Sequence, residues 1–300
     1  MITILGPTAT GKTGFASFIA SQFNGEIISA DSRQVFKGMN IGTGKDIDEY
    51  TVNGLDIPYH LIDIVEPGYE YNVFEFQKDF LAAYQLIESH EKFPILCGGT
   101  GMYIESVLKG YKLIDVPVNN ELREEMELKS DVELENILMD YKNIHNTTDI
   151  TERDRLLRAI EIQKYYVEHP NIDTSFPKIE SVIIGINFDR RVVRARITER
   201  LEQRLEEGMV EEVQALLDGG LSPEQLKFYG LEYRFITQYI EGEIAYNEMF
   251  RRLNTAIHQF AKRQMTWFRR MEKQGFEIHW LDGNLSHQEK MMQLIPLLKH

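Results

Sequence analysis

Residues 6–13 constrain this chain more than any other stretch of its sequence. They read GPTATGKT and match the phosphate-loop pattern G-x-x-x-x-G-K-[ST]. The flanks fit the motif, because an apolar run over residues 2–5 predicts a strand and phenylalanines at helical spacing over residues 15–23 predict a helix. Such a turn offers backbone N–H groups and a helix N-terminus to an anion. We therefore predict a phosphate-binding site formed by Gly6, Pro7, Thr8, Ala9, Thr10, Gly11, Lys12 and Thr13.

Two side chains of this loop add specific chemistry. Lys12 brings a full positive charge, and the Thr13 hydroxyl is placed to hold Mg²⁺. Mg²⁺ is the only metal that we infer, since the eight histidines show no H-x-x-x-H or HExxH spacing. The single cysteine, Cys97, excludes an internal disulfide and a cysteine-based zinc site within one chain.

The charge of the chain narrows the classes of function. A formal net charge of −14 argues against general binding of nucleic acid, because contacts of Lys and Arg with phosphates supply most of that affinity. Two segments are basic nevertheless. Six arginines against two glutamates give +4 over residues 190–204, and seven Lys and Arg residues against two glutamates give +5 over residues 247–273. These segments are compatible with one RNA bound at one place, although most charge runs are solvated helix faces.

The length and the hydropathy of the chain add two expectations. Its 300 residues suffice for one large domain or for a domain with a smaller one attached. No apolar run reaches eighteen residues and the first predicted strand begins at once, so we expect neither a membrane span nor a targeting segment. We therefore expect a cytoplasmic protein, and the sequence implies no obligate protein partner.

Two further loops follow predicted strands. The apolar run over residues 26–30 ends at Asp31, and the run over residues 93–97 leads into the turn GGTG at 98–101. In open α/β sheets, ligands lie beyond the carboxyl ends of the strands, so both loops should approach the phosphate loop. Asp31 is then a candidate general base, while an Asx-turn or a helix cap explains an aspartate at this position equally well.

A third apolar run bears on the Mg²⁺ site and on the fold. Residues 59–65 predict a strand with Asp63 near its end, which resembles the strand that assists Mg²⁺ in many P-loop proteins. His60 and Asp63 are explained equally well as structural groups. Because strand and helix patterns alternate, βαβ units are favoured. We predict an α/β fold with a P-loop NTPase-like, mainly parallel sheet flanked by helices and a small helical insertion domain.

The pattern changes after residue 115. Residues 116–177 form an acidic tract of helical character without strand patterns, and prolines lie near both of its ends. We predict that this tract is the insertion domain and that residues 1–115 and 178–300 form the P-loop core with the C-terminal helices.

A predicted helix after residue 189 carries three arginines on one face. Arg196, Arg200 and Arg204 lie at i, i+4 and i+8. Their charges repel one another unless they face anions. Pairing with neighbouring glutamates is the alternative, and it suits Arg204 better than the other two.

The last long helix, predicted over residues 246–271, combines arginines with an aromatic side chain. Arg263, Trp267 and Arg270 lie along one side of it. This combination suits contact with RNA phosphates and bases, although a tryptophan at helical spacing is more often part of a core.

Six stretches of the sequence form a set, in this order: GPTATGKT at 6–13, DSRQVFKGMNIGT at 31–43, HLID at 60–63, GGTGMYI at 98–104, RITER at 196–200 and AKRQMTWFRR at 261–270. Together they resemble one family, the tRNA dimethylallyltransferases, also called tRNA isopentenyltransferases, in which they occur in the same order. The resemblance implies transfer of a dimethylallyl group from dimethylallyl diphosphate to N6 of the adenosine directly 3′ of the anticodon in the tRNA anticodon stem-loop, with Mg²⁺ and without ATP. The bacterial type is implied, because the eukaryotic zinc finger needs cysteines that this chain lacks.

The resemblance also assigns roles to residues. The phosphate loop would hold the diphosphate of the donor, with Thr8 near its bridging oxygen and either Arg196 or Arg200 assisting. Asp31 would be the general base, and Asp31, Thr8, Lys12 and Thr100 would form the catalytic set. By the resemblance, contacts with tRNA would come from Asp31, Ser32, Arg33, Gln34, Thr100, Arg123, Asp154, Arg155 and Arg158. The residue types on the last long helix add Arg263, Trp267 and Arg270 to this set.

Two other classes of function stay open at this stage. A small-molecule P-loop kinase would use the first 110 residues almost equally well and would consume ATP. A nucleotide-gated RNA-binding protein would make Asp31 dispensable. Neither class requires GGTGMYI or AKRQMTWFRR. The chain departs from the family pattern at Gly44-Lys45 and over residues 229–234, which concerns the predicted tRNA contacts there rather than the chemistry.

Overall fold

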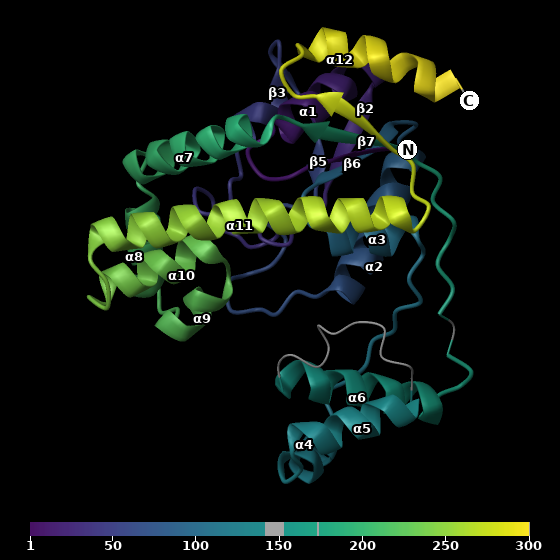
Figure 1. The fold of residues 1–300 in the computed structure, drawn as a ribbon. Coiled ribbons are helices and arrows are strands. Elements are labelled where there is room, and N and C mark those ends of the chain that lie inside the picture. The colour runs from purple at the N-terminus through teal and green to yellow at the C-terminus, as the bar shows by residue number, and fades with distance from the viewer. Residues whose placement is uncertain (142–152, 173, 300) are drawn as a thin grey trace. The chain divides into compact units, whose positions relative to one another are not determined.

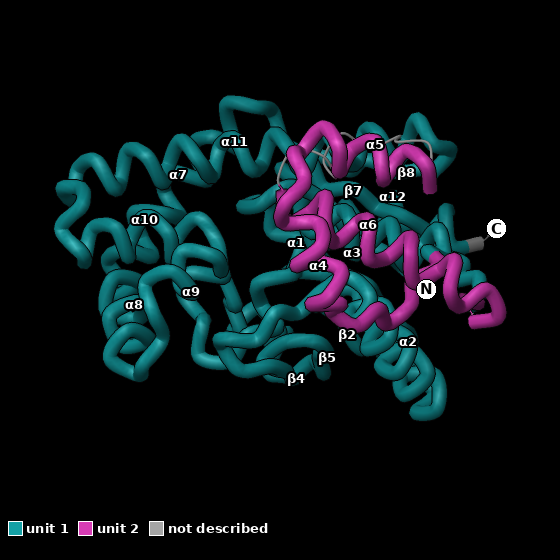
Figure 2. Tube along the Cα trace, turned by 90° about the horizontal axis from the view of Figure 1, so that it is seen from below, with its two compact units in different colours: residues 1–111, 177–300 teal, residues 112–176 magenta. Residues whose placement is uncertain are grey.

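A computed structural model describes residues 1–141, 153–172 and 174–299 (Figure 1). Two compact units are present: unit 1 comprises residues 1–111 and 177–300, and unit 2 comprises residues 112–176 (Figure 2). Parts of the predicted insertion domain, residues 142–152 and 173, lie outside the described residues.

Unit 1 is built on a six-stranded sheet in the order β5-β2-β6-β1-β7-β8, with every neighbouring pair parallel. Strands β1 and β2 are buried along their whole length, as expected where helices cover both faces of a parallel sheet. The predicted fold class is therefore confirmed. The strands are β1 (Ile2–Leu5), β2 (Gly25–Ser29), β5 (Tyr59–His60), β6 (Phe93–Gly98), β7 (Val182–Asn187) and β8 (Ile278–Asp282).

Helices of unit 1 cover the sheet and extend beyond it. Helix α1 contacts β2 and β6, α3 contacts α2 and α11, and α7 lies beside α11 (Figure 1). A hairpin of β3 (Thr51–Val52) and β4 (Leu55–Asp56) follows the 3₁₀ helix η1 (Ile47–Tyr50), and η3 (Ile295–Lys299) ends the chain. The helices are α1 (Lys12–Phe23), α2 (Val73–Ser89), α3 (Gly101–Leu108), α7 (Arg190–Glu206), α8 (Met209–Asp218), α9 (Pro223–Phe228), α10 (Leu231–Ile240), α11 (Tyr246–Lys273) and α12 (His287–Leu294).

Helices α7 to α11 share an apolar core that is separate from the core around the sheet. Their buried side chains recur at three- and four-residue spacing, so each helix turns one apolar face to the others. Val35, Phe36 and Met39, from the segment after β2, join this core. The cluster thus holds the segment that begins at Asp31 against the helices that carry the arginine face.

The strand predicted over residues 59–65 is wrong in its extent. Strand β5 ends at His60, because Leu61 and Asp63 adopt positive φ angles of 62° and 55° that a strand does not allow. Beyond β5, an isolated parallel bridge joins Phe36 and Val65.

Unit 2 is helical and has its own core. It contains α4 (Asn120–Glu127), α5 (Asp131–Tyr141) and α6 (Arg153–Glu168). Leu134 and Leu138 of α5 are fully buried against residues of α4 and α6. In the described part of the chain, no helix is both long enough and apolar enough to cross a membrane.

Replacing Leu138 by alanine should destabilise unit 2 by about 2–5 kcal/mol, because it removes a fully buried side chain and leaves a cavity. Leu128→Ala is the matched control. Its side chain is 93% exposed, so its effect should stay within about 0.5 kcal/mol. Hydrogen exchange of the α5 and α6 amides measures the difference. Equal protection in the two variants would contradict the assignment of this core.

Candidate active site

Three loops meet at one edge of the sheet, because strands β2, β6 and β1 are neighbours and run parallel. The phosphate loop follows β1, the 98–101 turn follows β6, and the segment from Asp31 follows β2. Backbone hydrogen bonds join the last two: the Ala30 N–H donates to the Cys97 carbonyl at 2.7 Å, and the Thr100 N–H donates to the Ala30 carbonyl at 3.1 Å. The predicted proximity of these loops is confirmed.

The phosphate loop has the conformation that its glycines permit. Gly6 has a φ of 156°, and a Cβ there would come within 2.6 Å of the Ile186 carbonyl oxygen. Gly11, with a φ of 69°, precedes the first turn of α1. Both the Thr10 hydroxyl and the Lys12 ammonium donate to the Pro7 carbonyl, at 2.8 and 2.7 Å. Lys12 therefore lies across the loop, where a phosphate at the start of α1 would meet it.

Two features suit a bound anion: the buried ammonium of Lys12 and the first turn of α1. Burial lowers the pKa of the Lys12 ammonium, with Asp31 and Glu49 among the nearby charges that act against this shift. An anion beside Lys12 would favour its charged form. The first turn of α1 carries no acidic residue that would compete for the free N–H groups.

The Thr13 side chain fits the Mg²⁺ that a phosphate loop implies. It is a hard oxygen donor in the first turn of α1. No group of three or more His, Cys, Asp or Glu side chains that could hold a metal occurs within the described ranges. A single hydroxyl at this position fits Mg²⁺, because Mg²⁺ keeps several waters and binds one or two protein oxygens together with substrate phosphates.

Asp31 makes the Asx-turn that its sequence position allows. Its Oδ1 accepts a hydrogen bond from the Arg33 N–H at 2.9 Å, and the carboxylate is partly exposed. Thr100 lies beside it, since its hydroxyl accepts from the Ser32 N–H at 3.0 Å and approaches the Ser32 hydroxyl at 3.4 Å. The structure thus brings Asp31, Ser32 and Thr100 together. A carboxylate in an Asx-turn keeps a second oxygen that can accept another proton.

Arg33 contacts an aromatic ring, whereas the side chain of Gln34 forms two hydrogen bonds. The Arg33 guanidinium lies 5.9 Å from the centre of the Phe228 ring. The Gln34 amide accepts from the Ser29 hydroxyl and donates to the Gly44 carbonyl, both at 3.0 Å. Gln34 therefore joins the end of β2 to the glycine-rich loop of residues 38–46 (GMNIGTGKD).

The arginine face of α7 lies at the phosphate loop. Arg196 donates from Nε to the Ala9 carbonyl at 2.8 Å, and its guanidinium lies 4.9 Å from the centre of the Phe188 ring. Arg200 and Arg204 both form ion pairs with Asp46 of the glycine-rich loop. These contacts distinguish Arg196, which is bonded to the phosphate loop itself, from Arg200, which is paired with a carboxylate beside it.

Beside this contact, residues of the phosphate loop and of α7 line a small hollow. Thr8 and Ala9 form one side, and Arg200, Arg204 and Glu232 supply charge. Burial raises the pKa of the Glu232 carboxyl. The apolar side chains of the hollow are Ile197, Leu201, Met209 and Ile257.

The glycine-rich loop is anchored by a carboxylate that the sequence analysis missed. Glu212 of α8 accepts hydrogen bonds from the N–H groups of Asn40, Ile41 and Gly42, at 2.8, 2.7 and 3.0 Å, and from the Tyr233 hydroxyl at 2.7 Å. A glutamate on a surface helix gives no sequence signal for this role.

Asp63 is the partner of Lys45, and His60 is the partner of Glu26. Both side chains therefore have the structural roles that were one of the two interpretations of this segment. The ion pairs of Asp46 with the arginines of α7 and of Lys45 with Asp63 were not predicted from the sequence.

Helix α11 reaches the site through its buried face. Trp267 packs on Gly101, where a Cβ would come within 2.3 Å of the indole. Arg270 stacks 3.9 Å from the centre of the Trp267 ring and forms an ion pair with buried Glu105 at 2.5 Å. Arg263 is exposed. Contacts of these three residues with tRNA stay predictions. The helix contributes one further residue, Gln264, whose amide bonds two of the loops.

Two of the three arginines predicted to contact tRNA in unit 2 bond the same carboxylate. Arg123 and Arg158 both bond the Glu161 side chain, which is 1% exposed. Burial alone would raise the pKa of Glu161, but these hydrogen bonds lower it. Asp154 and Arg155, from the first turn of α6, are exposed. Two of the arginines thus also stabilise unit 2.

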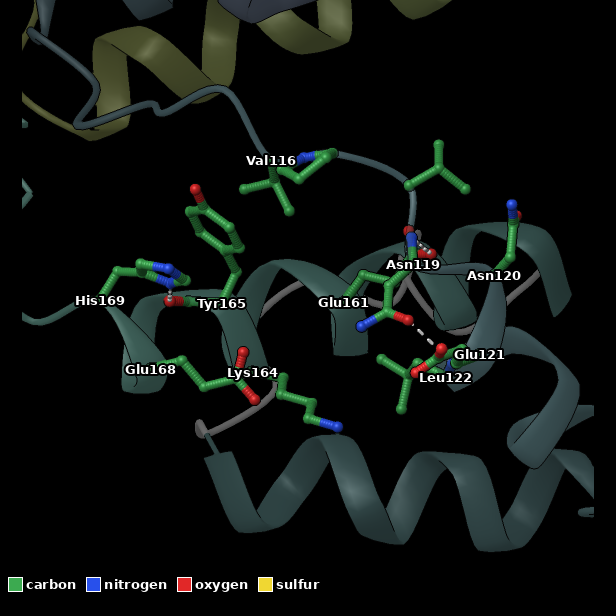
Figure 3. Close-up of a pocket in the computed structure, with 12 residues that line it drawn as sticks. Val116, Asn119, Asn120, Glu121, Leu122, Glu161, Lys164, Tyr165, Glu168 and His169 are labelled. Carbon is green, nitrogen blue, oxygen red and sulfur yellow. Dashed lines mark hydrogen bonds between the residues drawn. The ribbon is translucent and has the colours of Figure 1, made fainter.

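Unit 2 contains a hollow between α6 and the segment before α4 (Figure 3). Tyr165 and His169 stack with their ring centres 4.0 Å apart, and Val116 faces the same space. Asn119, Glu161, Lys164 and Glu168 complete a lining of mixed charge.

The fold and the three loops define a P-loop NTPase-like α/β protein in which the Asp31 carboxylate lies on a loop at the same sheet edge as the phosphate loop. Comparisons with known proteins give the family. The family model described as IPP transferase matches residues 34–271, and the model described as isopentenyl transferase matches residues 1–57. This chain belongs to the IPP transferase family, as its motifs indicated.

Bacterial proteins are similar to this chain along nearly its whole length. A tRNA dimethylallyltransferase from Bacteroides fragilis is 57% identical over 291 residues, covering 97% of this chain and 95% of the relative. Another, from Parabacteroides distasonis, is 57% identical over 301 residues, covering 100% and 98%.

Solved structures share the fold. A tRNA isopentenylpyrophosphate transferase from Bacillus halodurans has a TM-score of 0.71 at 29% identity, covering 99% of this chain and 95% of that chain. A eukaryotic dimethylallyltransferase acting on tRNA has a TM-score of 0.75 at 22% identity, covering 94% and 73%.

The affinity for an anion should fall at alkaline pH in the wild-type protein but not in a Lys12→Arg variant. Because burial lowers the pKa of Lys12 from 10.5, wild-type affinity for inorganic diphosphate should fall as the pH rises through that lowered pKa and the ammonium loses its charge. Arginine stays charged at these pH values. Titration calorimetry from about pH 7 to about pH 10 measures the difference. Lys178→Arg, at an exposed position, is the control; an equal decline in all three proteins would contradict this role of Lys12.

Proposed function

We propose that this protein transfers a dimethylallyl group from dimethylallyl diphosphate to N6 of the adenosine directly 3′ of the anticodon in tRNA, with release of diphosphate. One observation carries the proposal: in a chain of the IPP transferase family, the Asp31 carboxylate lies on the loop next to the 98–101 turn, at the sheet edge that also bears the phosphate loop. Donor and acceptor can therefore meet at this edge.

Transfer breaks the bond between C1 of the allyl group and the diphosphate oxygen, and it forms the bond between C1 and N6. The diphosphate leaves with the electron pair, and the N6 proton goes to the Asp31 carboxylate. The exocyclic amine of adenine is a weak nucleophile, since its lone pair is delocalised into the ring. A stabilised leaving group and a base acting together meet this difficulty.

Several groups of unit 1 are suited to the leaving diphosphate. The N–H groups of the phosphate loop and Lys12 would bind its oxygens, with Thr8 near the bridging oxygen. Arg196, bonded to the Ala9 carbonyl, and Arg200, which lines the adjoining hollow, would add positive charge. Preorganised donors of this kind each contribute about 3–4 kcal/mol to stabilisation of a transition state.

Mg²⁺ bound at Thr13 would supply Lewis-acid charge to the diphosphate. Lys12, the loop N–H groups and the arginines orient the leaving group from the protein side. The carboxylate of Asp31 and the hydroxyl of Thr100 face the acceptor.

Contacts with tRNA are proposed for both units. In unit 1 they comprise Ser32, Arg33, Gln34 and Thr100, and Arg263, Trp267 and Arg270 on α11. In unit 2 they comprise Arg123, Asp154, Arg155 and Arg158. A base that reacts within the anticodon loop must leave its stack, at a cost of a few kcal/mol that is lowest in single-stranded RNA. We further propose that the protein acts in the cytoplasm, where such an acceptor is found.

The alternative of a small-molecule kinase is not favoured. The phosphate loop serves both activities, but relatives that align over nearly the whole chain carry the name tRNA dimethylallyltransferase. The two functions differ in the group that they transfer. A kinase transfers a phosphoryl group from ATP, whereas the proposed reaction transfers a dimethylallyl group and releases diphosphate.

The protein with Mg²⁺, dimethylallyl diphosphate and unmodified tRNA should add one five-carbon group to each acceptor tRNA. Mass spectrometry of the digested nucleosides detects the N6-modified adenosine and its position. A parallel reaction with ATP in place of the prenyl donor is the control. ATP turnover without prenylation would instead indicate the kinase.

Asp31→Asn should slow transfer by about 10²- to 10⁴-fold while binding of tRNA is retained. The asparagine side-chain oxygen can still accept from the Arg33 N–H, so the turn observed at 2.9 Å is kept and only the base is lost. Single-turnover rates and filter binding measure the two effects. Asp48→Asn, at an exposed position of η1, is the matched control. An Asp31→Asn rate equal to that of the control would remove Asp31 as the base.

A further inference from the structure

Gln264 interrupts the apolar stripe that α11 buries. Its buried neighbours along the helix are Ala261 and Phe268, and the spacing of the stripe predicts an apolar side chain between them. Gln264 is 7% exposed. Burying an amide costs free energy unless the amide is hydrogen-bonded. A glutamine in such a stripe therefore needs a reason beyond the packing of the helix.

The two ends of the Gln264 amide bond two different loops. Its Oε1 accepts from the Thr8 N–H at 2.9 Å, and its Nε2 donates to the Gly99 carbonyl at 2.9 Å. The partners fix the orientation of the amide, because only its oxygen accepts and only its nitrogen donates. Gly99 allows this approach, since a Cβ there would come within 2.5 Å of Nε2.

The same turn is bonded on its other side to the segment of Asp31. The Thr100 hydroxyl accepts from the Ser32 N–H at 3.0 Å, and the Thr100 N–H donates to the Ala30 carbonyl at 3.1 Å. A continuous set of hydrogen bonds thus runs from the phosphate loop through Gln264 and the 98–101 turn to the residue after Asp31. Within this set, the side chain of Gln264 connects the phosphate loop to the 98–101 turn.

We propose that Gln264 is a positioning residue for prenyl transfer: its two hydrogen bonds set the spacing between the phosphate loop and the Asp31 carboxylate. The inference rests on the proposed function, in which the first loop holds the donor and Asp31 faces the acceptor. A misplacement of about 1 Å between reacting groups costs about 10²-fold in rate. Gln264 acts through Thr8 and Gly99, so its loss should lower the rate of transfer rather than the affinity for either substrate alone.

Gln264→Glu tests this geometry through its pH dependence. The carboxylate can still accept from the Thr8 N–H, but it presents an oxygen without a proton to the Gly99 carbonyl. Protonation of the glutamic acid restores the donor. Relative to wild type at each pH, its single-turnover rate should be lower by about 10- to 100-fold at about pH 8 and should recover most of this loss at about pH 6.

Two variants separate this effect from a general defect. Gln264→Met has a similar volume and neither hydrogen bond, so it should be slow relative to wild type at both pH values, without recovery. Gln77→Glu is the matched control. Gln77 of α2 is 4% exposed and its Nε2 donates to the Ser106 and Tyr111 carbonyls, both at 2.9 Å. Its rate relative to wild type should not recover at low pH, and thermal melting checks that each variant is folded.

Two outcomes overturn the proposal. One is a Gln264→Met variant that transfers at the wild-type rate, which decides the question even where Gln264→Glu does not fold. The other is a Gln264→Glu variant whose rate relative to wild type is the same at both pH values. Wild-type protein that transfers no prenyl group at all counts against the proposed function instead, so the two failures are distinguishable.

Discussion

Parallel pairing of β2, β6 and β1 is the constraint on which the site depends. The carboxyl ends of these strands reach the same edge of the sheet, so residues about 70 to 90 positions apart in the chain become neighbours there. The 98–101 turn occupies the centre, since β6 lies between the other two strands. Hydrogen bonds from this turn to Ala30 and Ser32, and through Gln264 to Thr8, then hold all three loops.

Charge is concentrated locally in a chain that is acidic as a whole. Lys12, Arg196, Arg200 and Arg204 gather around the phosphate loop although the formal net charge is −14. The surrounding acceptors keep these cations in place: carbonyl oxygens of the loop bind Lys12 and Arg196, and Asp46 pairs with Arg200 and Arg204. The acidic total therefore says little about what this edge of the sheet can bind, because the field at short range is set by the nearest groups.

The sequence predicted the parts of the site that depend on local patterns. The phosphate loop and the Asx-turn at Asp31 are properties of a few consecutive residues, and they were found. The strand over residues 59–65 was placed wrongly, since its apolar composition hid the positive φ angles at Leu61 and Asp63. Gln264 had a usable signal, a polar residue within an apolar helical stripe. Glu212 had none, because its partners are backbone groups of a distant loop.

The sequence by itself determined the parallel α/β fold, the phosphate loop, the family and the identity of the candidate base. Hydrophobic periodicity and short motifs encode these features, and both are readable along the chain. Tertiary structure alone decided which partners the charged and amide side chains take. In the folded protein, Arg200 and Arg204 pair with Asp46, and Arg270 pairs with Glu105. Gln264 lies between two loops and forms a hydrogen bond with each. Partner choice depends on which groups folding brings within about 3 Å, and that distance is set by packing between segments far apart in the sequence.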